Sequence, residues 1–272
     1  MKKIVECVPN FSEGRDSGII SQITDAIQSV QDVLLLDVDP GASTNRTVVT
    51  FIGEPEAVGE AAYRAIAKAA ELIDMSKHHG EHARFGATDV CPFVPVSGVS
   101  MEDCARLARE LGQRVGDELG IPVYLYEHAA STPARRNLAD VRSGEYEGLE
   151  KKLAKPEWRP DYGPAAFNPG AGATAIGARE FLIAYNINLN TTDRRYANEI
   201  AYELRERGRW KRSGNTDPFY YKGEVVYFEE DTFPDGNSDF VATSFAELNT
   251  FYQEQYGKDL ACLLYTSPSP RD

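Results

Sequence analysis

The stretch VLLLDVDPGASTNRTVVTFI, from Val33 to Ile52, decides the fold of the first part of the chain. The apolar run 33–38 predicts a strand that ends at Asp39, and the turn-forming residues 40–43 interrupt it. Residues 46–52 then show the alternation that is typical of a strand. The stretch therefore predicts two consecutive strands joined by a turn.

A helix and a strand are predicted on each side of this pair. Upstream, residues 3–8 predict a short strand and 10–14 a turn, and Asp16 is a typical N-cap for the apolar helical repeat that follows it. Downstream, apolar residues at helical spacing predict a long helix over 58–73, and 92–96 predicts the next strand. The resulting order β-α-β-β-α-β is that of a ferredoxin-like unit.

Two more elements extend this unit. Ser100 and Asp103 are typical of a capping box at the start of a helix. Residues 121–126 predict a further strand that extends the sheet. The predicted fold class is therefore α+β.

The second part of the chain is expected to be a separate and incomplete unit. Residues 181–189 alternate as a strand and 193–207 predict a helix, whereas the acidic, aromatic segment after it offers one hairpin, around Lys222 and Gly223. The final stretch 262–272 resembles translated cloning sequence. We therefore expect an N-terminal subdomain over 1–178, a partial second subdomain over 179–261 that is also ferredoxin-like, and a non-native tail over 262–272.

Composition and charge exclude several classes of protein. The 272 residues are 42% hydrophobic and 26% charged, which is typical of a globular protein, and no apolar run approaches the about 20 residues of a membrane span. A net charge of −13 argues against nucleic-acid binding. The N-terminus lacks a signal-peptide core, and the four cysteines lack CxxC spacing. We therefore expect reduced thiols and a cytoplasmic location, with no nucleic-acid or membrane partner.

Three of the four histidines fall within the segment 75–93, which the sequence predicts to be largely a loop. Histidine titrates near neutral pH, so His78, His79 or His82, oriented by Glu81 or Asp89, could transfer a proton. The spacing lacks the i, i+4 pair of a helical zinc site, so no metal is predicted. The remaining alternative is that the histidines are ordinary solvated loop residues.

Two other segments carry candidate binding residues. Asp39, at a strand end, could face a cationic group, whereas Asn45 and Arg46 could bind a carboxylate; ordinary turn chemistry is the alternative. Segment 161–179 is rich in small residues, which allow close approach of the backbone to a ligand. It has neither a Walker A nor a GxGxxG pattern, and a plain linker is its alternative interpretation.

Taken together, these segments resemble the formiminotransferase family. The matching strings run in family order from Lys3 to about Arg209: VECVPNFSEG (5–14), LLDVDPGASTNRTV (35–48), LIDMSKHHGEHARFGATDVCPFVPV (72–96), VYLYEHAA (123–130), RSGEYEGLEKKL (142–153) and FNPGAGATAIGAREFLIAYNINLN (167–190). From about Trp210 the resemblance to better-known members is expected to lapse, which predicts a chain truncated in its C-terminal subdomain.

The resemblance implies an activity and a set of site residues. The activity is transfer of the formimidoyl group from N-formimidoyl-L-glutamate to N5 of tetrahydrofolate, the co-substrate, in histidine breakdown. The family's catalytic histidine matches His82. Two ferredoxin-like subdomains would bind folate between them, and its binding stretch matches Gly163, Pro164, Ala165, Ala166, Phe167, Asn168, Pro169, Gly170, Ala171 and Gly172.

From the chemistry we infer two additional roles and keep three rival activities. Asp39 would steady the cationic formimidoyl group, and Arg46 or Arg84 would hold a substrate carboxylate. The rivals are formyl transfer between 5-formyltetrahydrofolate and glutamate, a metal-dependent amidohydrolase and a non-catalytic folate-binding module. A homodimer and a separate cyclodeaminase partner are left open, since the chain contains no cyclodeaminase domain.

Overall fold

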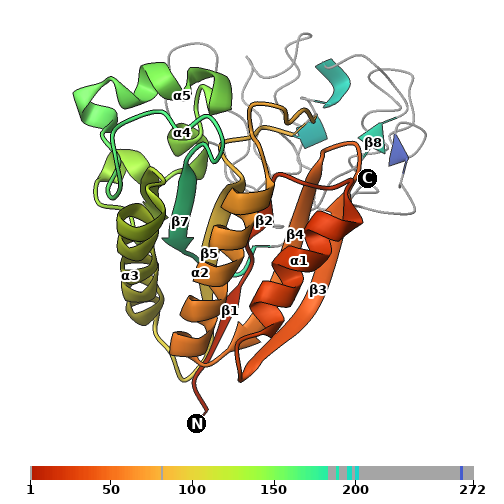
Figure 1. Cartoon of the computed structure of the whole chain (residues 1–272), viewed down its shortest axis with the longest axis vertical. Helices are drawn as coiled ribbons and strands as arrows, with labels where there is room; N and C mark the ends of the chain where they lie inside the picture. The colour runs from red at the N-terminus through yellow and green to blue at the C-terminus, as the bar shows by residue number, and fades with distance from the viewer. Residues whose placement is uncertain are drawn as a thin grey trace, which may run out of the picture. The chain divides into compact units, whose positions relative to one another are not determined.

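The computed structural model describes residues 2–80, 82–182, 188–189, 195–197, 200–201 and 264–265. Its contacts divide the chain into two compact units, of which the first extends to Ala184 and the second begins at Tyr185. In the first unit a mixed sheet of seven strands is combined with helices (Figure 1). The predicted α+β class is therefore confirmed.

The sheet has a continuous order from one edge to the other. Across the sheet the strands are β3 (Val33–Gly41), β4 (Arg46–Gly53), then β1 (Ile4–Cys7) and β2 (Asn10–Phe11), which occupy one position, and finally β5 (Thr88–Ser97), β7 (Thr174–Ala178) and β6 (Val123–Glu127). All pairings among β1 to β5 are antiparallel, whereas β7 is parallel to both β5 and β6. The antiparallel half of the sheet therefore comes from the predicted β-α-β-β-α-β segment.

Helices α1 (Ser17–Gln28), α2 (Pro55–Leu72) and α3 (Met101–Leu119) lie together on one face of this sheet (Figure 1). The N-caps predicted from the sequence are confirmed. The Asp16 side chain accepts hydrogen bonds from the first turn of α1, and Ser100 and Asp103 form a reciprocal capping box on α3. Local side-chain chemistry therefore determines where α1 and α3 begin.

Buried side chains form one cluster on each face of the sheet. Val49 and Phe51 alternate with half-buried residues along β4 and belong to the larger cluster, which packs beneath the helices. Along β6, Val123 belongs to this cluster and its neighbour Tyr124 to the second one. Successive side chains of a strand point to opposite faces. The second cluster, which includes Leu149 of α5, therefore lies on the face opposite α1–α3.

That second face is covered in part by short helices between β6 and β7. They are a 3-10 turn (Pro133–Arg135), α4 (Leu138–Val141), α5 (Glu145–Leu153) and a second 3-10 turn (Pro156–Trp158). Neither α4, α5 nor β7 was predicted. The strand β7 consists of TAIGA, whose small residues gave no clear strand pattern. Its insertion between β5 and β6 means that the predicted strand at 121–126 joins the sheet through β7 and not directly.

Three predicted boundaries were wrong. The strand β3 continues through Pro40 to Gly41, because an edge strand tolerates a residue that cannot donate to a ladder. Asn10 and Phe11 are in a strand and not in a turn, since they pair with both β4 and β5. The strand β5 begins at Thr88, so the end of the predicted histidine loop, including Asp89, belongs to the sheet.

The second unit is described at few positions. Its β8 (Asn188–Leu189) pairs antiparallel with β9 (Leu264–Tyr265), and residues 195–197 and 200–201 are helical. Most of the predicted strand over 181–189 and of the helix over 193–207 lies outside the described residues, as does the hairpin at Lys222–Gly223. Within the predicted tail, only 264–265 is described. The domain boundaries, the second ferredoxin-like unit and the foreign tail therefore stay predictions.

None of the helices among the described residues is long and apolar enough to cross a bilayer.

The cysteines at positions 7, 91 and 104 are all free thiols, as expected for reduced residues. Cys7 and Cys91 lie on neighbouring strands with their sulfur atoms 3.6 Å apart, and burial raises the pKa of Cys7 well above its ordinary value. Cys262 lies outside the described residues.

Candidate active site at the histidine loop

The candidate site is built around a break in the ladder between β2 and β5. Asn10 pairs with Val90 and Phe11 with Thr88, so the register shifts and Asp89 is left without a partner residue in this pairing. Irregularities of this kind redirect a side chain, and they are frequent near active sites. The Asp89 carboxylate is fully buried and contacts one residue from β4 and one that follows α4.

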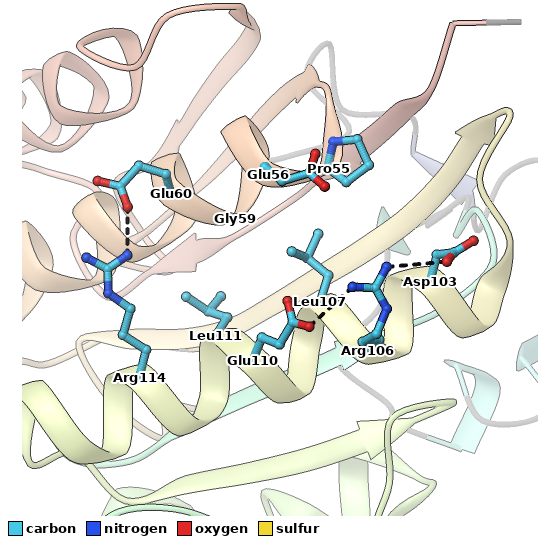
Figure 2. A pocket seen from close by; sticks show the side chains of 10 residues that line it. All are labelled: Pro55, Glu56, Gly59, Glu60, Asp103, Arg106, Leu107, Glu110, Leu111 and Arg114. Carbon is cyan, nitrogen blue, oxygen red and sulfur yellow. Dashed lines mark hydrogen bonds and ion pairs between the residues drawn. The ribbon is translucent and has the colours of Figure 1, made fainter.

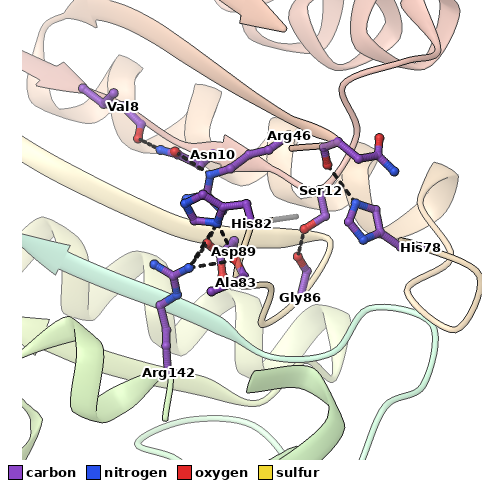
Figure 3. A network of polar contacts seen from close by, with 11 residues as sticks. Val8, Asn10, Ser12, Arg46, His78, His82, Ala83, Gly86, Asp89 and Arg142 are labelled. Carbon is purple, nitrogen blue, oxygen red and sulfur yellow. Dashed lines mark hydrogen bonds and ion pairs between the residues drawn. The ribbon is translucent and has the colours of Figure 1, made fainter. Parts of the chain in front are cut away.

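Two arginines share one oxygen of this carboxylate. Nη1 of Arg46 donates to Oδ2 of Asp89, and Nη2 of Arg142 lies 3.3 Å from the same atom (Figure 3). Nε of Arg46 also donates to Oδ1 of Asn10 at 3.0 Å. Neither Oδ1 of Asp89 nor Nε of Arg142 has a hydrogen-bond partner among the residues that the structure describes. The cluster has one carboxylate for two guanidinium groups, which leaves it cationic.

His82 is half-buried against this cluster, as Figure 3 shows. Its Nδ1 lies 2.6 Å from the carbonyl oxygen of Ala83. Because a carbonyl oxygen only accepts, Nδ1 carries the proton, and Nε2 of the neutral ring is left with a lone pair. Nη2 of Arg142 donates to the same carbonyl oxygen at 2.8 Å and lies 3.5 Å from Nδ1. The imidazole is therefore fixed in the tautomer that can accept a proton at Nε2.

The surroundings also keep this imidazole neutral. Burial lowers the pKa of His82 below its ordinary value of 6.5, and the charge of Arg46 lowers it further. The smaller effect of Arg142 acts in the same direction, whereas the hydrogen bond to Ala83 and the charge of Asp89 oppose it. A neutral imidazole near pH 7 can act as a general base.

The sequence did not point to Arg142. This residue follows α4, an element that was not predicted, and it lies 60 positions from His82 in the chain. No local pattern marks it, although it begins one of the strings that resemble the formiminotransferase family. Asp89, by contrast, is a predicted orienting group. It contacts the arginines, and no hydrogen bond between it and His82 is seen in the described part of the chain.

The other described histidines lie differently. His78 is buried, and its Nε2 donates to the carbonyl oxygen of Asn45 at 2.8 Å. His79 is exposed. The Asn45 amide holds the loop itself, since its Oδ1 accepts from the Gly14 N–H and its Nδ2 donates to the carbonyl of His79, both at 3.0 Å. Glu81 lies outside the described residues. Among the described histidines of this loop, His82 is the one that lies in the charged cluster.

Arg84, a predicted carboxylate ligand, already has protein partners. Its guanidinium donates to the carbonyl oxygen of His78 and to the carboxylate of Glu147, and it lies over the Tyr146 ring at 5.1 Å from the centroid. Arg84 therefore ties the histidine loop to α5.

The predicted folate-binding stretch lies beside the histidine loop. The Met75 N–H donates to the carbonyl of Gly170 at 2.8 Å, and Gly86 forms an isolated bridge with Gly172. Within the stretch, Oδ1 of Asn168 accepts from two following N–H groups, and Phe167 packs against the ring of Tyr146. Residues 163–166 are exposed and small. Two segments far apart in the sequence are therefore adjacent in the fold.

Asp39 lies on the same face of the sheet as this cluster. Asp39 pairs with Val48 of β4. On its other side, Val48 pairs with Asn10 of β2, and Asn10 pairs with Val90 of β5. Directly opposed residues point to one face, and Val90 belongs to the cluster on the face opposite α1–α3. Asp39 and the Asn10 amide that binds Arg46 therefore belong to one row across the sheet.

A pocket also lies on the helical side, between α2 and α3 (Figure 2). Its charged residues pair with one another, as in the contacts of Arg114 with Glu60 and of Arg106 with Glu110. This pocket contains none of the candidate site residues. Among the described residues, no group of three or more histidine, cysteine or acidic side chains could hold a metal ion.

Comparison with known proteins identifies the family. Residues 4–179 match the model of the formiminotransferase domain, N-terminal subdomain. The chain is 47% identical over 208 residues to a glutamate formimidoyltransferase of Streptococcus pyogenes serotype M1, covering 76% of this chain and 70% of that protein. It is 52% identical over 204 residues to a glutamate formimidoyltransferase of Thermoplasma acidophilum, covering 74% and 67%.

A longer match extends the similarity along the chain. The chain is 50% identical over 257 residues to a formimidoyltransferase-cyclodeaminase of Mus musculus, a match that covers 93% of this chain and 47% of that protein. A match of this extent continues past residue 209, whereas the matches to the two glutamate formimidoyltransferases cover only about three quarters of the chain. The expected lapse of similarity near Trp210 therefore does not apply to the longer match. The chain spans about half the length of the formimidoyltransferase-cyclodeaminases that it matches, or less. The matches place the histidine loop and the small-residue segment within one known domain, and the chain belongs to the formiminotransferase family.

Proposed function

We propose that this chain transfers the formimidoyl group of N-formimidoyl-L-glutamate to N5 of tetrahydrofolate in histidine breakdown. The observation that carries the proposal is the state of His82, a neutral imidazole whose Nδ1 is engaged by Ala83 and whose Nε2 has a lone pair. Family membership supports the reaction, since two relatives about half identical to this chain and covered to two thirds of their length or more are glutamate formimidoyltransferases.

His82 would act as base and acid in turn. The bond that forms joins the folate N5 to the amidine carbon, and the proton lost from N5 passes to Nε2 of His82. The bond that breaks joins that carbon to the glutamate nitrogen, which receives the same proton from His82. The imidazole ends the cycle neutral, so one histidine serves both steps.

Arg46 is the stronger of the two carboxylate candidates. It belongs to the cationic cluster beside His82, whereas the guanidinium of Arg84 is bound to Glu147 and to the loop backbone. An excess positive charge at the cluster favours a substrate that carries carboxylates. Asp39 is proposed to steady the cationic formimidoyl group from the same face of the sheet, and an Asp39→Asn variant with unchanged turnover would remove it from the scheme.

Tetrahydrofolate is proposed to bind along Gly163–Gly172 as co-substrate. Residues 163–166 are exposed and lack bulky side chains, so a flat ligand could approach the backbone closely. The half-buried rings of Tyr146 and Phe167, 5.3 Å apart, offer aromatic surface beside them. The finer fold assignment, a ferredoxin-like unit, is also proposed here and is supported by the antiparallel order β3-β4-β1-β5. A homodimer and a cyclodeaminase partner stay predictions.

The proposal is tested by following glutamate release from formimidoylglutamate with the full chain. Tetrahydrofolate is added or omitted, with and without a chelator, and 5-formyltetrahydrofolate with glutamate is offered as the alternative pair. Release that requires tetrahydrofolate and resists the chelator is the expected result. Glutamate release that needs no folate and is abolished by the chelator would contradict the proposal and indicate metal-dependent hydrolysis. Folate binding without turnover would also contradict it and indicate a binding module.

The matched variants are His82→Gln and His79→Gln. Loss of a positioned acid–base group costs about 10²–10⁴-fold in rate. We therefore expect kcat to fall by this factor for His82→Gln and to be unchanged for His79→Gln, because His79 is exposed and only its backbone carbonyl holds the loop. Equal rates for the two variants would refute the role of His82.

A further inference from the structure

Lys152 of α5 is a buried lysine with no role in the proposed reaction. It is 6% exposed, and no carboxylate in the described part of the chain forms an ion pair with its ammonium. Its Nζ donates instead to the carbonyl oxygens of Asp140, Val141 and Ser143 and to the Ser143 hydroxyl, at distances up to 3.2 Å. The face of the Trp158 ring closes the other side, 3.9 Å from Nζ to the ring centroid. Lysines are almost never fully buried without such partners, so these contacts indicate a structural role for Lys152.

The positions of the bound carbonyl groups show which segment of the chain Lys152 holds. Val141 and Ser143 are the neighbours of Arg142 on either side, so one ammonium group binds a backbone carbonyl before this arginine and another after it. The carbonyl of Arg142 itself accepts from the Glu145 N–H at 2.8 Å. The helix α4 has only four residues and could not hold this segment by its own hydrogen bonds.

The side chain of Arg142 points from this segment into the candidate site. Its Nη2 donates to the Ala83 carbonyl at 2.8 Å and lies 3.3 Å from the Asp89 carboxylate and 3.5 Å from Nδ1 of His82 (Figure 3). An arginine has many rotamers and loses them all in such an arrangement. Fixing the backbone at its base removes part of that freedom before the contacts form.

We propose that Lys152 is a positioning residue that holds the 140–143 segment so that Arg142 stays in contact with His82, Ala83 and Asp89. The inference rests on the proposed function only for its effect on turnover, because the contacts themselves do not depend on the substrate. Its consequence for His82 is electrostatic. The Arg142 charge is among the causes that lower the pKa of His82, so displacing Arg142 raises that pKa.

The experiment is an NMR titration of the histidine ring signals in the full chain, with the His82 signal assigned by its loss in His82→Gln. Lys152→Met is compared with Arg142→Met, with the double variant, and with Lys151→Met, the exposed neighbour on α5. We expect the pKa of His82 to rise in both single variants, to rise no further in the double variant than in Arg142→Met, and to stay at the wild-type value in Lys151→Met.

Two results would overturn the proposal. One is an unchanged His82 titration in a folded Lys152→Met protein, and the other is a further rise of the pKa in the double variant beyond Arg142→Met. If Lys152→Met fails to fold, Lys152→Gln replaces it, because the amide retains two donors and leaves no buried charge. A smaller rise of the pKa is then expected, and an unchanged value overturns the proposal. A chain that shows these shifts but no glutamate release would refute the proposed function and leave this inference intact.

Discussion

His82 and Arg142 donate to the same acceptor, the carbonyl oxygen of Ala83, at 2.6 Å from Nδ1 and 2.8 Å from Nη2. The shared oxygen fixes the histidine tautomer and brings a permanent positive charge against the ring. Both effects favour a neutral imidazole whose Nε2 accepts a proton. The chemistry proposed for this site therefore depends on Arg142, which follows α4, as much as on the histidine loop.

The first prediction concerns the acid limb of the pH–rate profile. The pKa of His82 is lowered from 6.5, and only the neutral ring accepts a proton. We therefore expect kcat/KM to be constant above pH 6.5 and to fall as the pH falls through the lowered pKa. Arg142→Met removes a charge that lowers the pKa, so the limb moves to higher pH. Asp89→Asn removes a charge that raises it, so the limb moves to lower pH. Shifts of both variants in one direction would contradict this electrostatic account.

The second prediction concerns stability and pH. His78 is buried, and burial lowers its pKa in the folded protein below 6.5, whereas the unfolded chain binds its proton at the ordinary value. The stability that neutral His78 contributes is thus fully present above pH 6.5 and is lost as the pH falls through the lowered folded pKa. Urea unfolding on both sides of pH 6.5 measures the loss. His78→Gln should flatten the dependence, and an identical slope would show that other groups cause it.

The third prediction compares two glycines of the proposed folate stretch. Gly172 has φ +67°, and a Cβ there would lie 2.5 Å from the carbonyl oxygen of Phe85. Gly172→Ala should therefore lower the free energy of unfolding by more than about 1 kcal/mol. At Gly170 the nearest atom to a Cβ is Oδ1 of Asn168 at 3.7 Å, so Gly170→Ala should change stability by less than about 0.5 kcal/mol. Denaturant unfolding checks both, and equal effects would contradict the close approach of the two segments.

The fourth prediction concerns the support of the histidine loop. Asn45 has φ +48°, and its amide joins the Gly14 N–H to the carbonyl of His79. Asn45→Ala leaves both groups without these partners and should cost about 1–3 kcal/mol in the free energy of unfolding. Thr44→Ala is the control, because its hydroxyl makes a single 3.2 Å bond to Gly41. A midpoint for Asn45→Ala equal to that of the control would show that the loop does not depend on this amide.

Local patterns determined most elements of the first unit. Apolar periodicity predicted α1, α2 and α3, and capping residues marked the starts of α1 and α3. The alternation after Asn45 predicted β4, because these features depend on residues only a few positions apart. The cluster of histidines also identified the loop that carries His82. The short β7 was missed because its small residues have little intrinsic preference, and only parallel pairing with β5 and β6 makes it a strand.

The sequence by itself therefore determined the order of the main helices and strands, the family resemblance and the histidine loop. Only the tertiary structure decided the environment of the site. It broke the β2–β5 register at Asp89, brought Arg46 to that carboxylate across 43 positions, and brought Arg142 to His82 across 60. Helix and strand periodicity acts over neighbouring residues, whereas the charge and burial that set the proton affinity of a histidine depend on groups joined only by folding.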